Sequence, residues 1–349
     1  MSEKFRKFGK NMLALFIGIS IGLLILESFL HLYNPFPSRF RGNKIQLKTN
    51  FKKQILIDPK IEGLDSVIYY SVNKLGFRGE EKPENFGELY SIITIGGSTT
   101  ECSLLDDSKT WTAQLGKKLK KNHPGIWINN AGMDGATTYG HSILLDDYVL
   151  KLKPKMVVFL IGINDRGRKD FSNEDGNLID RRESFFRKLV KKSEVANLAN
   201  NLYLMYRTHK VNIGHILNNN KPIAVPDSGT AVKIDSVKLE ELLRPYRKDV
   251  PQYTERVRLL ATKCLKNNIR PVFVTQPLVY GGDYWELMEL YNKAVISVCK
   301  ELNVECIDLA NELKKDPHYF YDEMHYTNQG ADSVASIIYR RLNNVVNKK

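Results

Sequence analysis

The stretch from Ser91 to Glu101 reads Ser-Ile-Ile-Thr-Ile-Gly-Gly-Ser-Thr-Thr-Glu, and the rest of the chain is organised around it. Its β-branched first half, bounded by glycine, predicts a buried central strand. Gly96 and Gly97 allow a sharp turn, because neither carries a Cβ atom. Ser98 then stands where a helix can begin, with backbone N–H groups pointing outward. Such a serine is either an exposed nucleophile or only a helix N-cap, and this stretch alone favours the cap.

Downstream of this stretch, apolar runs of strand length alternate with amphipathic segments. The predicted strands are Ser91–Ile95, Ile126–Asn130, Met156–Ile161, Pro271–Thr275 and Val304–Ile307. The predicted helices are Thr110–Lys121, Ser142–Leu152, Tyr253–Asn267, the later part of Asp283–Leu302, and Ala331–Leu342. This alternation predicts a parallel sheet with helices on both faces. In such folds the functional site lies beyond the carboxyl ends of the strands.

The N-terminus carries an apolar run from Met12 to Tyr33, interrupted by Glu27 and His31. As a helix its roughly 22 residues span about 33 Å, enough for the hydrocarbon core of a bilayer. Basic residues precede the run, as expected of a cytoplasmic tail at 1–11, with the remainder outside the cytoplasm in the periplasm or extracellular space. A cleaved signal peptide is the alternative, but no small-x-small cleavage site follows, so we expect an uncleaved anchor at 12–33.

The charge of the chain is unevenly distributed. Of the net +13, residues 1–53 contribute ten Lys or Arg against two acids, and residues 166–210 contribute eleven against six. The basicity thus belongs to a membrane flank and one insertion, and no nucleic-acid motif accompanies it, so no nucleic-acid partner is expected. None of the four cysteines lies in a Cys-x-x-Cys pair, which argues against zinc; their disulfide pairing stays open.

Two segments lie outside the strand–helix alternation. Residues 34–90 predict a small irregular or β-rich lead-in that packs on the main domain, with Val67–Val72 as a strand. Arg78 could serve an active site, but a structural salt bridge is the favoured role. The main domain is expected over 91–345, with a long basic insertion at about 166–250. An insertion after a strand's carboxyl end forms either a lid over the site or an outer packing layer, and the sequence does not separate the two.

Three further polar blocks stand out, and two of them directly follow predicted strands. Asn130–Gly135 after the second strand permits a tight loop with free N–H groups, and Gly162–Asp165 after the third places an amide at the same edge. Near the C-terminus, Asp322–His325 puts an Asp three residues before a His. That Asp can accept the Nδ1 hydrogen of the His and leave Nε2 free to take a proton from Ser98.

Together with Gly96-Gly97-Ser98, these blocks resemble the SGNH (GDSL) hydrolase family, membrane-anchored bacterial type, over roughly Ser91 to Leu342. The resemblance implies a flavodoxin-like, three-layer α/β/α sandwich around a five-stranded parallel sheet, here preceded by one transmembrane helix. It implies Ser98, Asp322 and His325 as the catalytic residues. Gly97 departs from the family pattern, which has Asp at that position.

The resemblance also implies an oxyanion hole, formed by the backbone N–H groups of Ser98 and Gly135 and the side-chain amide of Asn164. Gly132 is the alternative to Gly135. Ser98 would attack an ester carbonyl while His325 takes its proton, giving an acyl-serine that water hydrolyses. No metal or cofactor is needed.

The expected function is a serine esterase that removes an acyl group, in the first instance acetyl, from an envelope or exported glycan or another small ester. An O-acyltransferase that uses the same serine is an alternative, and so is a non-catalytic, tethered glycan-binding or assembly protein. A thiol site at Cys102 is a weaker third reading, since no His stands at local spacing. The sequence leaves the oligomeric state open.

Overall fold

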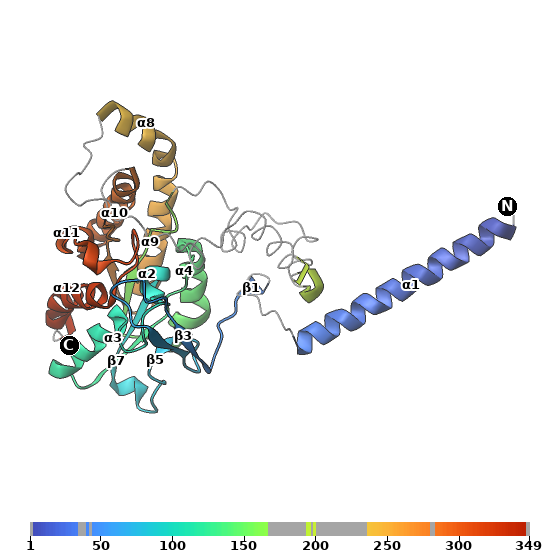
Figure 1. Cartoon of the computed structure of the whole chain (residues 1–349), viewed down its shortest axis with the longest axis horizontal. Coiled ribbons are helices and arrows are strands. Elements are labelled where there is room, and N and C mark those ends of the chain that lie inside the picture. The colour runs from blue at the N-terminus through green and yellow to red at the C-terminus, as the bar shows by residue number, and fades with distance from the viewer. Residues whose placement is uncertain are drawn as a thin grey trace. The chain divides into compact units, whose positions relative to one another are not determined.

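The computed structural model describes residues 3–33, 40–41, 44–166, 193–196, 198–199, 236–279 and 283–346. These residues fall into two compact units. One holds the described residues up to 46 together with 193–196 and 198–199, and the other holds 47–166, 236–279 and 283–346 (Figure 1). The remainder of the predicted insertion at 166–250 lies outside the described residues, apart from its last helix.

The first unit contains the N-terminal helix α1 (Glu3–Leu32) and a two-stranded antiparallel pair, β1 (Phe40–Arg41) with β2 (Lys44–Ile45). Within α1, residues 6–32 are long and apolar enough to cross a membrane, and a signal sequence meets the same description. Glu27 interrupts this apolar surface. Its carboxylate accepts hydrogen bonds from the Ser193 hydroxyl at 2.7 Å and from the N–H groups of Glu194 and Val195 at 2.7 and 3.0 Å.

The second unit is built on a six-stranded sheet in the order β10-β9-β8-β6-β7-β5. Its strands are β5 (Arg78–Gly79), β6 (Tyr90–Gly96), β7 (Ile126–Asn130), β8 (Met156–Leu160), β9 (Arg270–Val274) and β10 (Glu305–Ile307). The five predicted strands pair in parallel, each within one residue of its predicted limits. The expectation of a five-stranded parallel sheet is nevertheless wrong, because β5 pairs antiparallel with β7 and makes the sheet mixed. A two-residue strand carries no alternation of apolar residues by which the sequence could reveal it.

The helices of this unit cover both faces of the sheet. They are α2 (Ser98–Glu101), α3 (Trp111–Asn122), α4 (Thr138–Leu144), α5 (Leu150–Leu152), α8 (Ser236–Arg247), α9 (Val250–Lys266), α10 (Asp283–Leu302), α11 (Leu309–Glu312) and α12 (Asn328–Val346). Short 3₁₀ turns lie at Phe86–Glu88 and Pro317–Tyr319. Helix α12 packs on α3, side by side in Figure 1, and α9 packs on α4 and α10.

Alternate side chains of each buried strand serve the two helical layers. In β6, Ile92 belongs to the core formed with α3 and α12, whereas the next residue, Ile93, is equally buried and has the opposite orientation. The stacked rings of Phe159 and Phe273, with centroids 4.9 Å apart, lie between β8 and β9. Burial on both faces explains why these strands read as continuous apolar runs.

The lead-in contributes a hairpin of β3 (Phe51–Leu56) and β4 (Val67–Val72). Its second strand contacts the loop after α2: Asp106 and Asp107 accept hydrogen bonds from the backbone N–H groups of Tyr69 and Ser71, at 3.0 and 3.1 Å. The residues that follow Ser98 are thereby attached to the lead-in. The domain boundaries at 34, 91 and 345 stay predictions.

Candidate active site

Ser98 lies at the carboxyl end of the central strand, where β6 turns into α2. Gly97 precedes it as the helix N-cap, and the carbonyl of Gly97 accepts the N–H groups of Thr100 and Glu101. The helix is one turn long and ends at Glu101, and its C-cap Cys102 adopts the left-handed conformation at φ 53°. Ser98 is the first helical residue, so the helix itself offers its N–H no acceptor.

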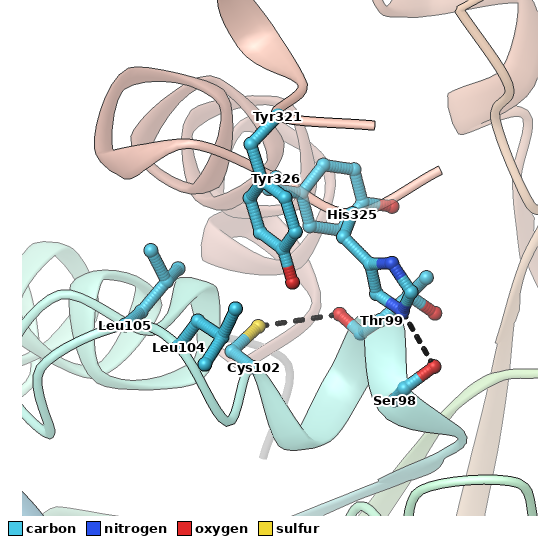
Figure 2. Close-up of a pocket in the computed structure, with 8 residues that line it drawn as sticks. All are labelled: Ser98, Thr99, Cys102, Leu104, Leu105, Tyr321, His325 and Tyr326. Atoms are coloured by element: carbon cyan, nitrogen blue, oxygen red, sulfur yellow. Dashed lines mark hydrogen bonds between the residues drawn. The ribbon is translucent and has the colours of Figure 1, made fainter. Parts of the chain in front are cut away.

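Ser98, His325 and Asp322 form a continuous chain of hydrogen bonds. The Oγ atom of Ser98 is 2.8 Å from Nε2 of His325, as Figure 2 shows, and Nδ1 of His325 is 2.6 Å from Oδ2 of Asp322. The second carboxylate oxygen, Oδ1 of Asp322, accepts the N–H groups of Met324 and His325 at 2.9 and 2.7 Å. The loop therefore fixes both the carboxylate and the imidazole that the sequence places three residues apart.

The charge of Asp322 is stabilised in this position. Burial opposes its ionisation, but the hydrogen bond and charge of His325 and the two backbone N–H groups together hold the pKa of the Asp322 carboxyl below its usual value. The ring of Tyr321 stacks on His325, with centroids 5.5 Å apart and planes 10° from parallel. Burial and the nearby charge of Asp322 raise the pKa of the Tyr321 phenol, so it stays neutral beside the imidazole.

A tight turn that is attached to the end of β6 carries Gly135. The N–H of Ala136 donates to the carbonyl of Met133 at 3.1 Å, and Gly135 lies between them with φ +69°, which glycine adopts without strain. The N–H of Met133 donates to the carbonyl of Gly96 at 2.9 Å, which attaches the turn to the end of β6. Among the described residues, none accepts the N–H of Gly135.

The other glycine of this loop, Gly132, has a different environment. Its N–H donates to Oδ1 of Asn130 at 2.8 Å, so it is occupied inside the loop. Between the two oxyanion donors that the sequence left open, the hydrogen bonds favour Gly135.

The side chain of Asn164 reaches the same edge of the sheet. Its Nδ2 donates to the carbonyl of Ala136 at 3.0 Å, directly beside the Gly135 turn. A Cβ atom at Gly97 would approach that nitrogen to 2.5 Å. The amide of Asn164 therefore lies against the backbone that precedes Ser98, so all the predicted site residues converge on one place.

A family comparison agrees with this geometry. Residues 94–332 match the model of the GDSL-like lipase/acylhydrolase family. The chain belongs to this family. It is accordingly a carboxylic ester hydrolase. No curated protein matches the sequence.

Among solved structures, the chain is similar to LAE5, an α/β hydrolase from the metagenome of Lake Arreo, Spain. The two are 14% identical with a TM-score of 0.45, and the similarity covers 74% of this chain and 97% of LAE5. The acetylxylan esterase Axe2 from Geobacillus stearothermophilus is 16% identical, with a TM-score of 0.44, 72% of this chain and 94% of Axe2 covered. The acetyl xylan esterase AlAXEase is 15% identical, with a TM-score of 0.45 and coverages of 72% and 99%. At this distance none indicates what the present chain acts on.

This GDSL-family site has a supporting arginine, Arg78, for which the sequence favoured a salt bridge over a role in the site. Arg78 is buried and forms that salt bridge with Asp107 at 2.7 Å. Its guanidinium also donates to the carbonyls of Glu101, Cys102 and Leu105, at 2.6 to 2.9 Å. These carbonyls follow the one-turn helix that begins at Ser98. A cation at that position compensates their partial negative charge, and local spacing gave no signal for it.

A second network, also unforeseen, joins the two loops that carry Gly135 and Asn164. The buried carboxylate of Asp165 accepts the N–H and the hydroxyl of Thr138, the hydroxyl at 2.6 Å. Arg256 of α9 donates to the same hydroxyl at 2.6 Å and lies 3.3 Å from Asp165. Arg256 is far away in the sequence, and only the fold brings it to this site.

The pocket at Ser98 and His325 is small and is lined by both polar and apolar side chains. Its lining is completed by Thr99, Cys102, Leu104, Leu105, Tyr321 and Tyr326 (Figure 2). Burial raises the pKa of the Cys102 thiol to about 12, although Arg78 opposes the shift, so this thiol is not a nucleophile near neutral pH. Within the described ranges, no three His, Cys, Asp or Glu side chains gather as metal ligands would.

Proposed function

We propose that the chain is a membrane-anchored serine esterase that removes an acyl group, in the first instance acetyl, from an envelope or exported glycan. The proposal rests on one observation above the others: Ser98 Oγ is 2.8 Å from His325 Nε2, and His325 Nδ1 is 2.6 Å from Asp322. These are the distances at which an imidazole removes a serine proton while a carboxylate orients it.

In the proposed reaction, Ser98 Oγ forms a bond to the ester carbonyl carbon as its proton passes to His325 Nε2. The carbonyl oxygen becomes an oxyanion that the N–H groups of Ser98 and Gly135 and the Asn164 amide receive. His325 then protonates the leaving alcohol, and the acyl-serine forms. Water, deprotonated by His325, attacks the acyl carbon and releases the acid, which restores the serine.

The acetyl assignment draws on the small size of the pocket beside Ser98, which suits a short acyl group. The glycan assignment draws on the apolar α1 helix, since a single span would tether the enzyme at a membrane surface. The basic residues of 166–210 suit an anionic polymer, although charge runs are more often solvated faces.

Labelling with a fluorophosphonate tests the mechanism on the full chain in detergent, with the adduct located by peptide mass. We expect the adduct on Ser98, with Ser98→Ala and His325→Ala both unlabelled. Acetate release from acetylated glycans then tests the substrate, with p-nitrophenyl acetate as the control that the enzyme is active. Labelling of another residue, or unchanged labelling in His325→Ala, would refute the assignment.

A further inference from the structure

The carboxylate of Glu101 connects three parts of the molecule at the site. Glu101 ends the one-turn helix that begins at Ser98. Its Oε2 accepts the backbone N–H of Asp134 at 2.5 Å, and its Oε1 accepts the hydroxyl hydrogen of Tyr70 at 2.9 Å. Tyr70 belongs to β4 of the lead-in hairpin. The nucleophile helix, the oxyanion turn and the lead-in thus meet at one side chain.

The contact with Asp134 matters because Asp134 immediately precedes Gly135. The peptide group between them carries the Gly135 N–H, so the direction of that N–H depends on how the Asp134 backbone is held. Asp134 and Gly135 are both exposed, and open space surrounds the position of a Cβ at Gly135. Packing therefore constrains this half of the turn weakly, and the hydrogen bond from Asp134 to Glu101 supplies a fixed point.

We infer that Glu101 is a positioning residue for the oxyanion donor Gly135, and that Tyr70 holds the Glu101 carboxylate in its working orientation. The inference rests on the proposed function, because it gives Gly135 the role of binding the oxyanion. Glu101 itself touches no reacting atom in this scheme. It acts through the turn, and it makes the lead-in hairpin part of the frame of the active site.

The variants separate geometry from charge. Glu101→Ala removes both acceptors. Glu101→Gln keeps an oxygen for the Asp134 N–H and offers an amide hydrogen to the Tyr70 oxygen. Tyr70→Phe removes only the hydroxyl, since its ring remains available to Arg78, whose guanidinium lies 4.4 Å from the ring centroid. Tyr69→Phe is the matched control, because Tyr69 is the neighbouring strand residue and is 62% exposed.

We would measure kcat and KM with p-nitrophenyl acetate on the full chain in detergent, and inhibition by a small alkylboronic acid. The boronic acid forms a bond from Ser98 Oγ to boron while the serine proton moves to His325, giving a tetrahedral anion that mimics the oxyanion intermediate. A misplaced donor weakens the binding of the tetrahedral species but not that of the substrate. The inhibition constant of the boronic acid should therefore rise by the same factor by which kcat falls, while KM stays within about twofold.

For Glu101→Ala we expect kcat to fall about tenfold to 100-fold, less than the loss of an entire oxyanion donor. Tyr70→Phe should lose about threefold to tenfold, Glu101→Gln should stay within about threefold of the parent, and Tyr69→Phe should be unchanged. If Glu101→Gln lost as much kcat as Glu101→Ala, the inference would be overturned, because the charge of Glu101 rather than its hydrogen-bond geometry would then set the activity. A Glu101→Ala variant with unchanged kcat and boronate inhibition would overturn it as well.

Three further outcomes are distinguishable. If Glu101→Ala does not fold, Tyr70→Phe decides, and unchanged kcat and boronate inhibition in that variant overturn the inference. If Ser98→Ala hydrolyses the ester as fast as the parent, the proposed function itself fails and takes the inference with it. Loss of activity in Ser98→Ala combined with full activity in Glu101→Ala rejects the inference alone.

Discussion

At the scale of single residues, the side chain of Asn164 has two amide hydrogens and uses one of them within the protein. Nδ2 donates to the carbonyl of Ala136, which fixes the plane of the amide, and no other acceptor for it is found among the described residues. In the proposed mechanism the second hydrogen serves the developing oxyanion. This division explains why an Asn suits the position better than a hydroxyl residue, which has one hydrogen to give.

Replacing that amide by a carboxylate of the same shape should abolish its donor function. We expect Asn164→Asp to lower kcat with p-nitrophenyl acetate by about 10² to 10³, because one oxyanion donor is lost and a negative charge replaces it. Asn344→Asp, at an exposed position of α12, is the control for the added charge. Equal kcat values for the two variants would remove Asn164 from the oxyanion hole.

Asp322 should make stability depend on pH. Its folded pKa lies below its ordinary value of about 3.9, so its stabilising effect is complete above that value and is lost as pH falls through the folded pKa. We expect the Tm advantage of the parent over Asp322→Asn at pH 5 to shrink as pH falls to about 3 and below. Thermal unfolding between pH 5 and pH 2 measures it, and an advantage that grows over that range would contradict the reasoning.

Much of the candidate site could be predicted from the sequence, because its residues follow strands directly or stand three positions apart. Ser98, Asn164 and the Asp322–His325 pair are of this kind, and the structure places all of them together, although their roles stay predictions. The supporting residues could not be predicted in the same way. Glu101 and Arg256 act through contacts with segments distant in the sequence, and only the folded chain defines those contacts.

At the scale of elements, the turn from β6 into α2 is matched to the loop that carries Asn164. Gly97 has φ −83°, which any residue can adopt. What limits a larger side chain at position 97 is therefore space and not the backbone conformation. The atom that a Cβ would meet, Nδ2 of Asn164, is the end of a movable side chain. A larger residue at position 97 can therefore be accommodated, but only by displacing the proposed oxyanion donor.

We expect Gly97→Ala to change Tm little and to lower kcat about tenfold or more, since displacement of a donor by about 1 Å has effects of that order. Gly97→Asp, which restores the residue typical of the family, should lower activity as well. Gly125→Ala is the control, because a Cβ there meets nothing within 4 Å. Undiminished kcat in both Gly97 variants would show that Asn164 has room to adapt.

Element boundaries were predictable where an element is buried and long. The helix predicted at Ser142–Leu152 shows the limit: α4 starts earlier, at Thr138, and a π-helical segment, Leu145–Val149, separates it from α5. The spacing of the apolar residues is that of a helix throughout. It does not distinguish the hydrogen-bond pattern of an α-helix from that of a π-helix.

At the scale of the whole molecule, the proposed membrane location rests on α1, which is apolar enough to be a membrane span or a signal sequence. If it is an uncleaved anchor, the full chain should remain in the membrane fraction after an alkaline carbonate wash, and mass spectrometry should find the N-terminal residues still attached. A chain lacking residues 1–33 should be released and is the control. Recovery of the wild-type chain in the soluble fraction, starting beyond residue 33, would establish a signal sequence instead.

The mixed sheet has a consequence for the solubility of the enzyme. Without β5, strand β7 would present a row of unpaired N–H and C=O groups, which is a template for pairing with the sheet of another molecule. Arg78 and Gly79 pair with the last two residues of β7, Asn130 and Asn129, and the opposite edge strand, β10, is three residues long. The segment that leads into the catalytic domain thus also shields its sheet from self-association. A shortened enzyme beginning at Ser91 would retain every candidate catalytic residue, but it would expose the unpaired edge of β7 to pairing with other molecules.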